Sequence, residues 1–309
     1  MADYLAITGG VGGAKLSLGL AQVLDPERVV FAVNTGDDFE HLGFAISPDI
    51  DTLTYTLAGL ANPKEGWGRH DETWSFMETL ERLGGETWFR LGDRDLALHA
   101  HRTAALTRGR SLTEVTADIA GRLGVAHRIL PMSDHPVRTT ILTADGELAF
   151  QHYFVRDRCA PHVTGFEFRG ARQAQLNPEI TALLPSLKGI IICPSNPFVS
   201  VDPLLAIADV RQQLAALDVP IVAVSPIVGG IAIKGPTAKM MAELAIPSTA
   251  AAVADHYGDL LDGFVLDEQD RALHGTLAVP TVVTPTVMVS LADRIALARA
   301  TLEFVDSLA

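Results

Sequence analysis

The chain has 309 residues, of which 48% are hydrophobic and 20% are charged, and it carries a formal net charge of −13. This composition is typical of a globular protein with a sizeable core, and it excludes an intrinsically disordered chain. The acidic balance, with no run of basic residues, argues against sequence-independent binding of nucleic acid, which requires clustered Lys and Arg. We therefore expect an anionic ligand to be held locally, by backbone amides, a metal ion or a few basic side chains.

The cysteines and the apolar runs bear on where the protein resides. Cys159 and Cys193 form neither a CxxC motif nor a zinc-binding spacing, so we interpret them as buried or half-buried thiols. No apolar run reaches the roughly 18 residues of a membrane span, and no charged-then-apolar leader precedes the first predicted strand. We expect a cytoplasmic protein with no membrane and no nucleic-acid partner.

Short runs rich in Val and Ile alternate with stretches of helical spacing along the chain. Strands are predicted at residues 4–8, 29–34, 189–194, 220–225 and 264–266. Helices are predicted at residues 14–24, 73–83, 204–217, 238–244 and 288–308. This alternation predicts an α/β fold with a Rossmann-like, mainly parallel sheet and helices on both faces.

The middle of the chain has a different pattern. Residues 51–123 are nearly all helical in spacing, and TTILTADGELAFQHYFV predicts a β-hairpin with Asp145 and Gly146 at its turn. We therefore predict a single domain over residues 1–309, with its Rossmann-like core at about 1–50 and 171–309. In this interpretation residues 51–170 form a helical and β-hairpin insertion.

The first candidate site is TGGVGGAK, residues 8–15, between the first predicted strand and helix. Glycines allow backbone amides to approach phosphate oxygens, and a helix N-terminus favours an anion. The stretch matches neither GxGxxG nor a Walker A loop. We predict phosphate contacts from Gly10, Gly12, Gly13 and Lys15, the last in the first helical turn, where a cation opposes the helix dipole unless it faces a phosphate. The alternative is a tight turn that only packs the strand against the helix.

Carboxylates crowd the next stretch, NTGDDFEHLGFAISPDIDTLTY. Asp37 and Asp38 follow the second predicted strand, and Asp49 and Asp51 lie at the start of a helix. Ligands of an open parallel sheet bind at the carboxyl ends of its strands. Two acidic clusters 12 to 14 residues apart fit a hard cation such as Mg²⁺ better than a ribose. An N-capping Asp49 or Asp51 beside a solvated acidic loop is the alternative.

Two later loops, CPSNPFVSV and SPIVGGIAIKGP, follow predicted strands at the same edge of the sheet. Both combine short polar side chains or glycines with prolines that also serve to end the strands. Three loops of this kind on one edge favour a nucleoside diphosphate over a single small anion. The residues that we place on this ligand are Ser195, Asn196, Ser225, Gly229, Gly230 and Lys234.

Two further stretches carry charges and aromatic rings. In WFRLGDRDLALHAHRT, Asp93 and Asp95 start a helix on which His99 and Arg102 share a face with Asp95. A salt-bridged helix N-terminus explains these residues as well as a ligand site does. In WGRHDETW, polar groups lie between Trp67 and a second tryptophan, so a planar ring ligand and simple core packing both stay open.

Seven segments together resemble the family of 2-phospho-L-lactate transferases (CofD, called FbiA in actinobacteria), which act in the biosynthesis of the deazaflavin coenzyme F-420. They follow the family's order over nearly the whole chain: GGVGGAK, NTGDD, SPDIDTLTYTLAG, GWGRHDETW, LGDRDLALH, PSNPFVSV and SPIVGGIAIKGP. The resemblance implies a Mg²⁺-dependent transferase whose donor joins a phosphorylated three-carbon acid to GMP. The acceptor would be the deazaflavin Fo, whose ribityl hydroxyl attacks the phosphorus that carries the acid while GMP leaves.

The resemblance also implies roles for individual residues. Asp37 and Asp51 match the family's metal-binding acids, and Asp51 and Arg90 match positions that contact the deazaflavin. We take Asp51 and Asp49 as the catalytic acids, with Asp49 as a candidate base, and expect Asp51→Asn to abolish turnover with the fold intact. Two further residues are placed on the deazaflavin, Trp67 and Asp93.

Several points stay open at this level. The donor acid is phospholactate, phosphoenolpyruvate or 3-phosphoglycerate, and the bacterial character of TGGVGGAK and GWGRHDETW disfavours phospholactate; the family also suggests a homodimer. An NAD(P)-dependent oxidoreductase is supported by the glycine loop but opposed by the missing GxGxxG. A non-catalytic nucleotide-binding regulator is opposed by the intact PDID and LGDRD segments.

Overall fold

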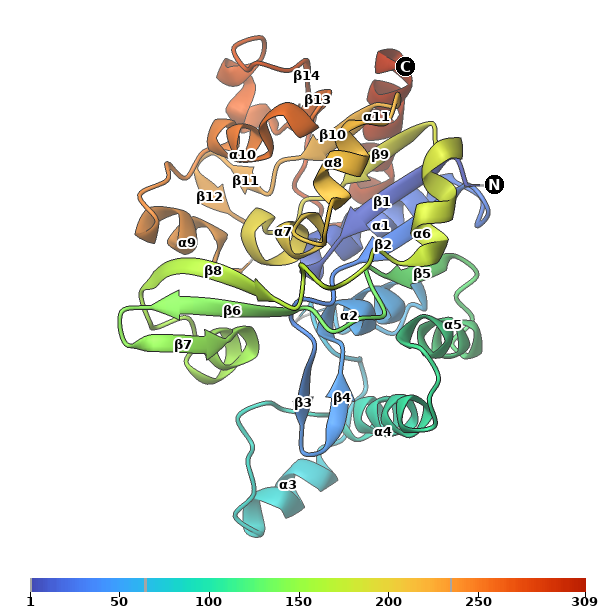
Figure 1. The fold of residues 1–309 in the computed structure, drawn as a ribbon, viewed down its shortest axis with the longest axis vertical. Coiled ribbons are helices and arrows are strands. Elements are labelled where there is room, and N and C mark those ends of the chain that lie inside the picture. The colour runs from blue at the N-terminus through green and yellow to red at the C-terminus, as the bar shows by residue number, and fades with distance from the viewer. Residues whose placement is uncertain (1, 64–65, 234) are drawn as a thin grey trace.

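A seven-stranded parallel sheet lies at the centre of the computed structural model, which describes residues 2–63, 66–233 and 235–309 (Figure 1). The strand order is β14-β13-β10-β9-β1-β2-β5, and neighbouring strands pair in parallel. The strands are β1 (Tyr4–Thr8), β2 (Val29–Val33), β5 (Arg128–Pro131), β9 (Gly189–Ile192), β10 (Ile221–Val224), β13 (Gly263–Leu266) and β14 (Thr281–Val283). The predicted fold class is confirmed.

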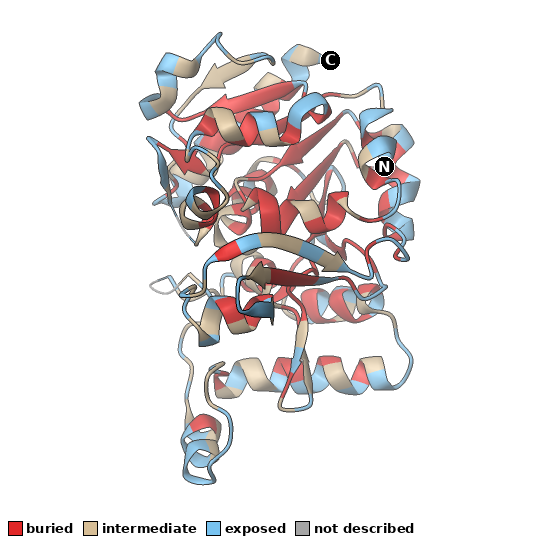
Figure 2. Cartoon of the chain, turned by 60° about the vertical axis from the view of Figure 1, so that its left-hand side comes forward, coloured by how far each residue is buried: buried red, intermediate tan, exposed pale blue. Residues whose placement is uncertain are grey.

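The inner strands are buried on both faces, which is why they read as continuous apolar runs. Along β1, Tyr4 and Ala6 point into one apolar core, whereas Leu5 and Ile7 point into the other. Figure 2 shows the strands of this sheet as the most continuously buried part of the chain. Two hydrophobic layers therefore fix the sheet between helices.

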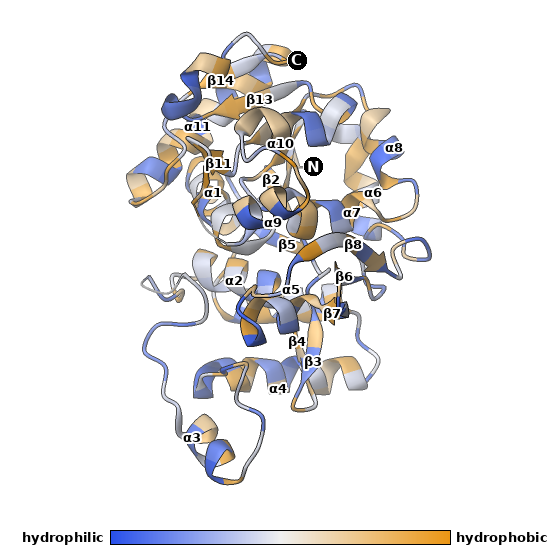
Figure 3. Ribbon diagram, turned by 90° about the vertical axis from the view of Figure 1, so that its left-hand side faces the viewer, coloured by the Kyte–Doolittle hydropathy of each residue, from blue (hydrophilic) through white to orange (hydrophobic). Residues whose placement is uncertain are grey.

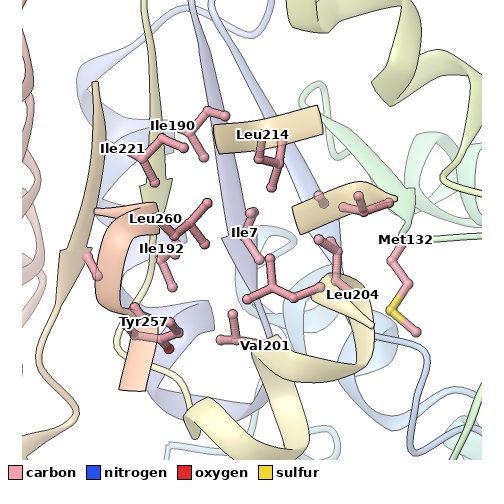
Figure 4. Packing of buried hydrophobic residues seen from close by; sticks show 14 of the residues in the cluster. Ile7, Met132, Ile190, Ile192, Val201, Leu204, Leu214, Ile221, Tyr257 and Leu260 are labelled. Carbon is pink, nitrogen blue, oxygen red and sulfur yellow. The ribbon is translucent and has the colours of Figure 1, made fainter. Parts of the chain in front are cut away.

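Helices cover both faces of the sheet. The first core is closed by α1 (Gly10–Val23), α2 (Pro48–Leu57), α5 (Leu112–Arg122) and α11 (Leu291–Leu308). The second core is closed by α6 (Pro178–Leu183), α7 (Asp202–Leu205), α8 (Val210–Ala215), α9 (Thr237–Glu243) and α10 (Ala250–Tyr257). Figure 4 shows this second core, where Ile7 packs between side chains of neighbouring strands and of α7 and α8. Across the described residues, none of the helices combines the length and apolarity needed to cross a lipid bilayer.

The single helix expected at residues 204–217 is two helices, α7 and α8. Asp209, between them, has φ +60°, a left-handed conformation that a continuous right-handed helix does not contain. Local apolar spacing runs through this break, so periodicity alone did not reveal it.

The order of the strands reverses between β1 and β9. The chain moves outward from β1 through β2 and β5 in one direction, and from β9 through β10, β13 and β14 in the other. Such a reversal opens a crevice at the carboxyl ends of the two central strands, where ligands of open α/β sheets bind. The two loops that flank this crevice are the glycine loop after β1 and the PSNP loop after β9.

The predicted insertion at residues 51–170 needs one correction, because β5 lies within it and pairs with β2 in the central sheet. This strand has only four residues and gave no signal of its own. Helices α2 and α5 of this range pack on the sheet, whereas residues 66–107 project from it together with a small hairpin of β3 (Phe39–His41) and β4 (Phe44–Ile46) and form the projecting segment (Figure 1). Its helices α3 (Ser75–Arg82) and α4 (Asp93–Thr107) mix hydrophilic and hydrophobic residues (Figure 3).

The predicted β-hairpin is confirmed in β6 (Arg138–Thr143) and β7 (Gly146–Ala149), which β8 (Val163–Arg169) extends as a third antiparallel strand. The end of the predicted second strand is different, because residues His152–Arg156 form a π-helical turn. A second small ribbon consists of β11 (Ile227–Val228) and β12 (Ile231–Ala232). Cys193 is buried and Cys159 half-buried, both as free thiols, as expected.

Candidate active site

A cavity of about 570 Å³ lies at the carboxyl ends of the central strands. Its volume is within the usual range for small-molecule sites, about 300–1,000 Å³. Loops after β1, β2, β9, β10 and β14 all contribute to its wall, as do α2 and the projecting segment. The predicted site residues that line it are Gly10, Gly12, Lys15, Asp37, Asp49, Asp51, Trp67, Arg90, Ser195, Asn196 and Ser225.

Other predicted site residues lie elsewhere. Gly13 is buried in α1, where a Cβ would come within 2.3 Å of the Thr8 hydroxyl oxygen. Gly229 and Gly230 form the turn between β11 and β12, with φ of +55° and +81°. These three glycines have structural roles in the described geometry and do not line the cavity. Lys234 lies outside the described residues.

Asp93 caps α3 and does not line the cavity. Its carboxylate accepts hydrogen bonds from the Thr73 hydroxyl and from the backbone N–H of Phe76. In return, Glu72 accepts a hydrogen bond from the backbone N–H of Asp95 in the first turn of α4. These reciprocal caps join the starts of α3 and α4, as acidic side chains commonly do at helix N-termini.

The segment before α4 supplies one side of the cavity. Trp67 is 49% exposed at the mouth, and Phe89 and Arg90 reach the wall. The Arg90 guanidinium lies over the ring of Trp74, 4.2 Å from its centroid. Such a cation–π contact restrains a long, flexible side chain. Trp74 packs beneath Arg90 and against a small apolar cluster that includes Met77 and Leu91, and it does not line the cavity, so core packing is the alternative that the structure supports for this ring.

The glycine loop, which follows β1, lies against the loop that follows β9. Helix α1 begins at Gly10, so Lys15 lies in its second turn and not in the first. The Lys15 ammonium donates a hydrogen bond to the Met288 carbonyl oxygen at 2.8 Å. A Cβ on Gly12 would lie only 2.4 Å from the Pro194 carbonyl oxygen. The loops after β1 and β9 thus touch, and only glycine fits at this contact.

We expect Gly12→Ala to destabilise the protein by about 1–3 kcal/mol, because the new methyl must push the PSNP loop aside. Gly121, an exposed residue in α5 whose Cβ would meet nothing within 4 Å, provides the matched control. Gly121→Ala should stabilise the protein by about 0.5–1 kcal/mol, the usual helix preference for Ala over Gly. Urea unfolding of both variants checks this, and a Gly12→Ala protein as stable as Gly121→Ala would contradict the close contact.

Uncharged hydrogen-bond donors hold two of the cavity carboxylates, those of Asp49 and Asp37. Asp49 accepts hydrogen bonds from the backbone N–H of Gly10 at 2.6 Å and from the Asn34 amide at 2.9 Å. Asp37 accepts from the same amide at 2.8 Å and from the Gln151 amide at 3.3 Å. Burial raises the pKa of Asp49 to about 6, and burial together with the charge of Asp49 raises the pKa of Asp37.

A cation, the guanidinium of Arg102, holds a third carboxylate of the cavity, that of Asp51. Arg102 on α4 is 1% exposed and bonds both oxygens of Asp51, one of them at 3.0 Å. His99 lies 3.7 Å from Asp51 and 3.2 Å from Asp95, which also accepts a hydrogen bond from the Tyr55 hydroxyl at 2.5 Å. Burial and the carboxylates of Asp95 and Asp51 raise the pKa of Tyr55. The predicted shared face of Asp95, His99 and Arg102 is confirmed.

Several cavity residues were missed by the sequence reasoning. Phe150 and Phe154 stack with ring centroids 5.4 Å apart and 7° between their planes, and Gln151 lies beside them. All three belong to the stretch interpreted as a strand, although the spacing of the two rings by four residues fits a helical turn. Tyr55 and Met288 are also part of the wall and had no local signal.

The donor set fits a hard cation that is shared with a phosphate ligand. In the described part of the chain, no three His, Cys, Asp or Glu side chains come together closely enough to hold a metal ion by themselves. Mg²⁺ commonly binds through one or two carboxylates and substrate phosphates, with water completing the shell. Among the described residues, the ionisable side chains on the wall include four acidic and two basic ones: Asp37, Asp49, Asp51, Asp95, Lys15 and Arg90.

A comparison with protein families shows to which family the chain belongs. The model described as 2-phospho-L-lactate transferase CofD matches residues 5–279 of the chain. The chain belongs to the CofD family. This membership confirms the expected enzyme class, a transferase of a substituted phosphate group.

Individual relatives of this CofD-family chain carry two different names. It is 38% identical to the phosphoenolpyruvate transferase of Streptomyces griseus, with 98% of each chain covered. It is also 38% identical to the 2-phospho-L-lactate transferase of Methanosarcina mazei, over 87% of this chain and 88% of that one. A crystal structure of a UPF0052 family member from Bacillus halodurans superposes with a TM-score of 0.62 at 13% identity, over 98% of this chain and 99% of that chain. That similarity supports the fold alone.

Proposed function

We propose that this chain transfers a phosphorylated three-carbon acid from a guanosine diphosphate-linked donor to the ribityl hydroxyl of the deazaflavin Fo, with release of GMP, in coenzyme F-420 biosynthesis. One observation carries the proposal: the glycine loop, the PSNP loop and the buried carboxylates line a single cavity at the strand-order reversal. The names of the relatives support transfer of such an acid, and the three donors to compare are the derivatives of phospholactate, phosphoenolpyruvate and 3-phosphoglycerate.

The donor end of the cavity is built from backbone and short polar groups. We place the diphosphate at the N-terminus of α1, beside Gly10, Gly12 and Lys15, because the N–H groups of a first helical turn lack partners within the helix and the helix dipole favours an anion there. Ser195, Asn196 and Ser225 would hold the rest of the nucleotide. A chain with a net negative charge can bind this anion because the N-terminus of α1 and the Lys15 side chain lie together on the cavity wall.

The acceptor end is aromatic. The stacked rings of Phe150 and Phe154, together with Phe89 and Trp67, offer flat apolar surface to a fused ring system. Arg90, held over Trp74, would donate hydrogen bonds to the polar edge of that ring. Asp51 would also contact the deazaflavin, as the family resemblance implies.

The reaction then requires two bond changes. The ribityl oxygen forms a bond to the phosphorus that carries the acid, and the bond from this phosphorus to the bridging oxygen breaks, so that GMP leaves with that oxygen. The hydroxyl proton passes to a carboxylate, for which Asp49 is our candidate because its pKa of about 6 suits a base near neutral pH. Mg²⁺, bound through Asp37 and Asp51 in our proposal, would neutralise charge on the diphosphate.

A donor comparison tests this function. The three guanylated acids, each mixed with Fo and Mg²⁺, are expected to yield one acid-bearing product by mass spectrometry, with GMP in equal amount. Removal of Mg²⁺ by a chelator should stop GMP release, and adding the metal back should restore it. Nucleotide binding without transfer from any donor would favour a regulator instead, and tight NADH binding without GDP binding would favour an oxidoreductase.

A further inference from the structure

Asn34 is a buried residue to which the sequence assigned no role. It follows β2 directly, is 1% exposed and lies behind the cavity wall. Its amide nitrogen donates to Asp37 at 2.8 Å and to Asp49 at 2.9 Å, and lies 3.3 Å from the Val199 carbonyl oxygen. One side chain thus joins the end of β2, the start of α2 and the loop after β9.

The chemistry of this position requires an amide. The backbone N–H of Gly36 donates to the side-chain amide oxygen (Oδ1) of Asn34 at 2.8 Å, which fixes that oxygen on one side and turns the NH₂ group toward the carboxylates. Ser or Thr would offer a single donor, and Asp would offer none and add another carboxylate. Gly9 leaves room for the arrangement, since a Cβ there would lie 2.7 Å from an Asp49 oxygen and 3.2 Å from the Asn34 Cβ.

A neutral donor has a consequence that an ion pair would not have. Arg102 holds Asp51 in place but also matches its charge. The Asn34 amide holds two carboxylates near each other without supplying a positive charge, so a cation that binds in the cavity is not repelled by the side chain that positions them. Holding like charges together in a buried place is unfavourable by itself, and it is maintained only where several hydrogen bonds oppose the repulsion.

We propose that Asn34 is a positioning residue that holds the Asp37 and Asp49 carboxylates together at the cavity wall, so that Asp37 is directed at a divalent cation shared with the donor phosphates and Asp49 stays beside it as the base. This inference rests on the proposed function, because the phosphates of the proposed donor are the reason to expect a cation at this place. Asn34 acts through the two carboxylates and does not touch the ligand itself.

Mn²⁺ binding to the purified protein tests the inference, with the free Mn²⁺ signal followed by electron paramagnetic resonance. Asn34→Ala is expected to bind Mn²⁺ about 10–100-fold more weakly than the unaltered protein, the usual cost of removing a group that orients a metal ligand. Where Asn34→Ala does not fold, Asn34→Ser is used instead, and its one remaining donor should give a smaller loss. Near-ultraviolet circular dichroism establishes that each variant is folded.

Asn177 offers a closely matched control. It is 0% exposed, donates to the Thr113 hydroxyl and the Pro131 carbonyl oxygen, and accepts from the backbone N–H of Glu179. Asn177→Ala therefore removes a similar set of buried hydrogen bonds away from the cavity. It should lose comparable stability and keep its Mn²⁺ affinity.

The outcomes separate this inference from the proposed function. Mn²⁺ affinity in Asn34→Ala equal to that of the unaltered protein, or an equal loss in Asn177→Ala, would overturn the role of Asn34. Weaker Mn²⁺ binding in Asn34→Ala alone supports it, even if the unaltered protein transfers no acid from any donor. Absence of transfer by the unaltered protein would overturn the proposed transferase function but not the positioning role of Asn34.

Discussion

Asp51→Asn is expected to abolish transfer and also to destabilise the protein by about 3–5 kcal/mol, because it leaves a buried guanidinium without its carboxylate. Arg102 is 1% exposed, and both of its terminal nitrogens bond Asp51. The partners are 51 residues apart, on α2 and α4, so the pair also joins the projecting segment to the core. Urea unfolding and a turnover assay measure the two losses separately. The sequence alone led us to expect an intact fold without turnover, and the buried ion pair adds a loss of stability to that expectation.

Two further variants distinguish the effect of the buried ion pair on stability from the role of Asp51 in the transfer reaction. Asp118→Asn removes a carboxylate that pairs with the exposed Arg122, and it should change stability far less, because water screens that pair. The double variant Asp51→Leu/Arg102→Met removes both buried charges and should regain much of the lost stability, as replacement of a buried ion pair by apolar groups often does. It should not regain transfer. A stable, active Asp51→Asn protein would contradict both the ion pair and the role of Asp51.

Local signals explain why much of the fold was predictable. Strands such as β1 and β2 are buried on both faces, so their apolar runs were visible without knowledge of their neighbours. The glycine loop could be placed at the sheet edge because it lies between such a strand and a helix. Strand β5 was missed because only pairing with β2 defines its four residues. The turn at His152–Arg156 was missed because aromatic and β-branched residues there favour strands by propensity.

The sequence predicted which segments form the site, but not which side chains contact one another within it. The sequence placed Asp37 at the sheet edge, because ligands of an open parallel sheet bind where its strands end, and it grouped Asp49 and Asp51 with Asp37 as a second acidic cluster at a helix start. It did not show that Asp51 is held by Arg102 or that Asn34 bridges the other two, since these contacts depend on packing between distant elements. It also placed Asp93 on the ligand, where the structure shows a helix cap. Acidic residues at helix starts serve both purposes, and only their surroundings distinguish them.

The stability of the metal-free protein is expected to fall as the pH rises from about 4 to about 7, because buried carboxyl groups must ionise. Asp38 accepts a hydrogen bond from Ser47 at 2.8 Å, and its Oδ1 lacks a partner among the described atoms. Burial raises the pKa of Asp38 to about 7 and that of Asp49 to about 6. Both values exceed the value of about 3.9 for an unfolded chain, so the native state binds more protons than the unfolded state in this range. Each such group then lowers the free energy of unfolding by roughly 1 kcal/mol per pH unit.

Urea unfolding at pH 5 and at pH 7, with a chelator present, measures this slope. Asp38→Asn keeps the shape of the side chain but cannot ionise, so it should lose less stability than the unaltered protein over the same interval. Mg²⁺ added at pH 7 should return stability to the unaltered protein, because a cation bound to Asp37, next to Asp49, offsets the negative charge that these two carboxyl groups gain when they ionise. Equal slopes in Asp38→Asn and the unaltered protein would show that Asp38 does not ionise within the buried site. Stabilisation by Mg²⁺ that is greater at pH 5 than at pH 7 would contradict competition between the cation and protons.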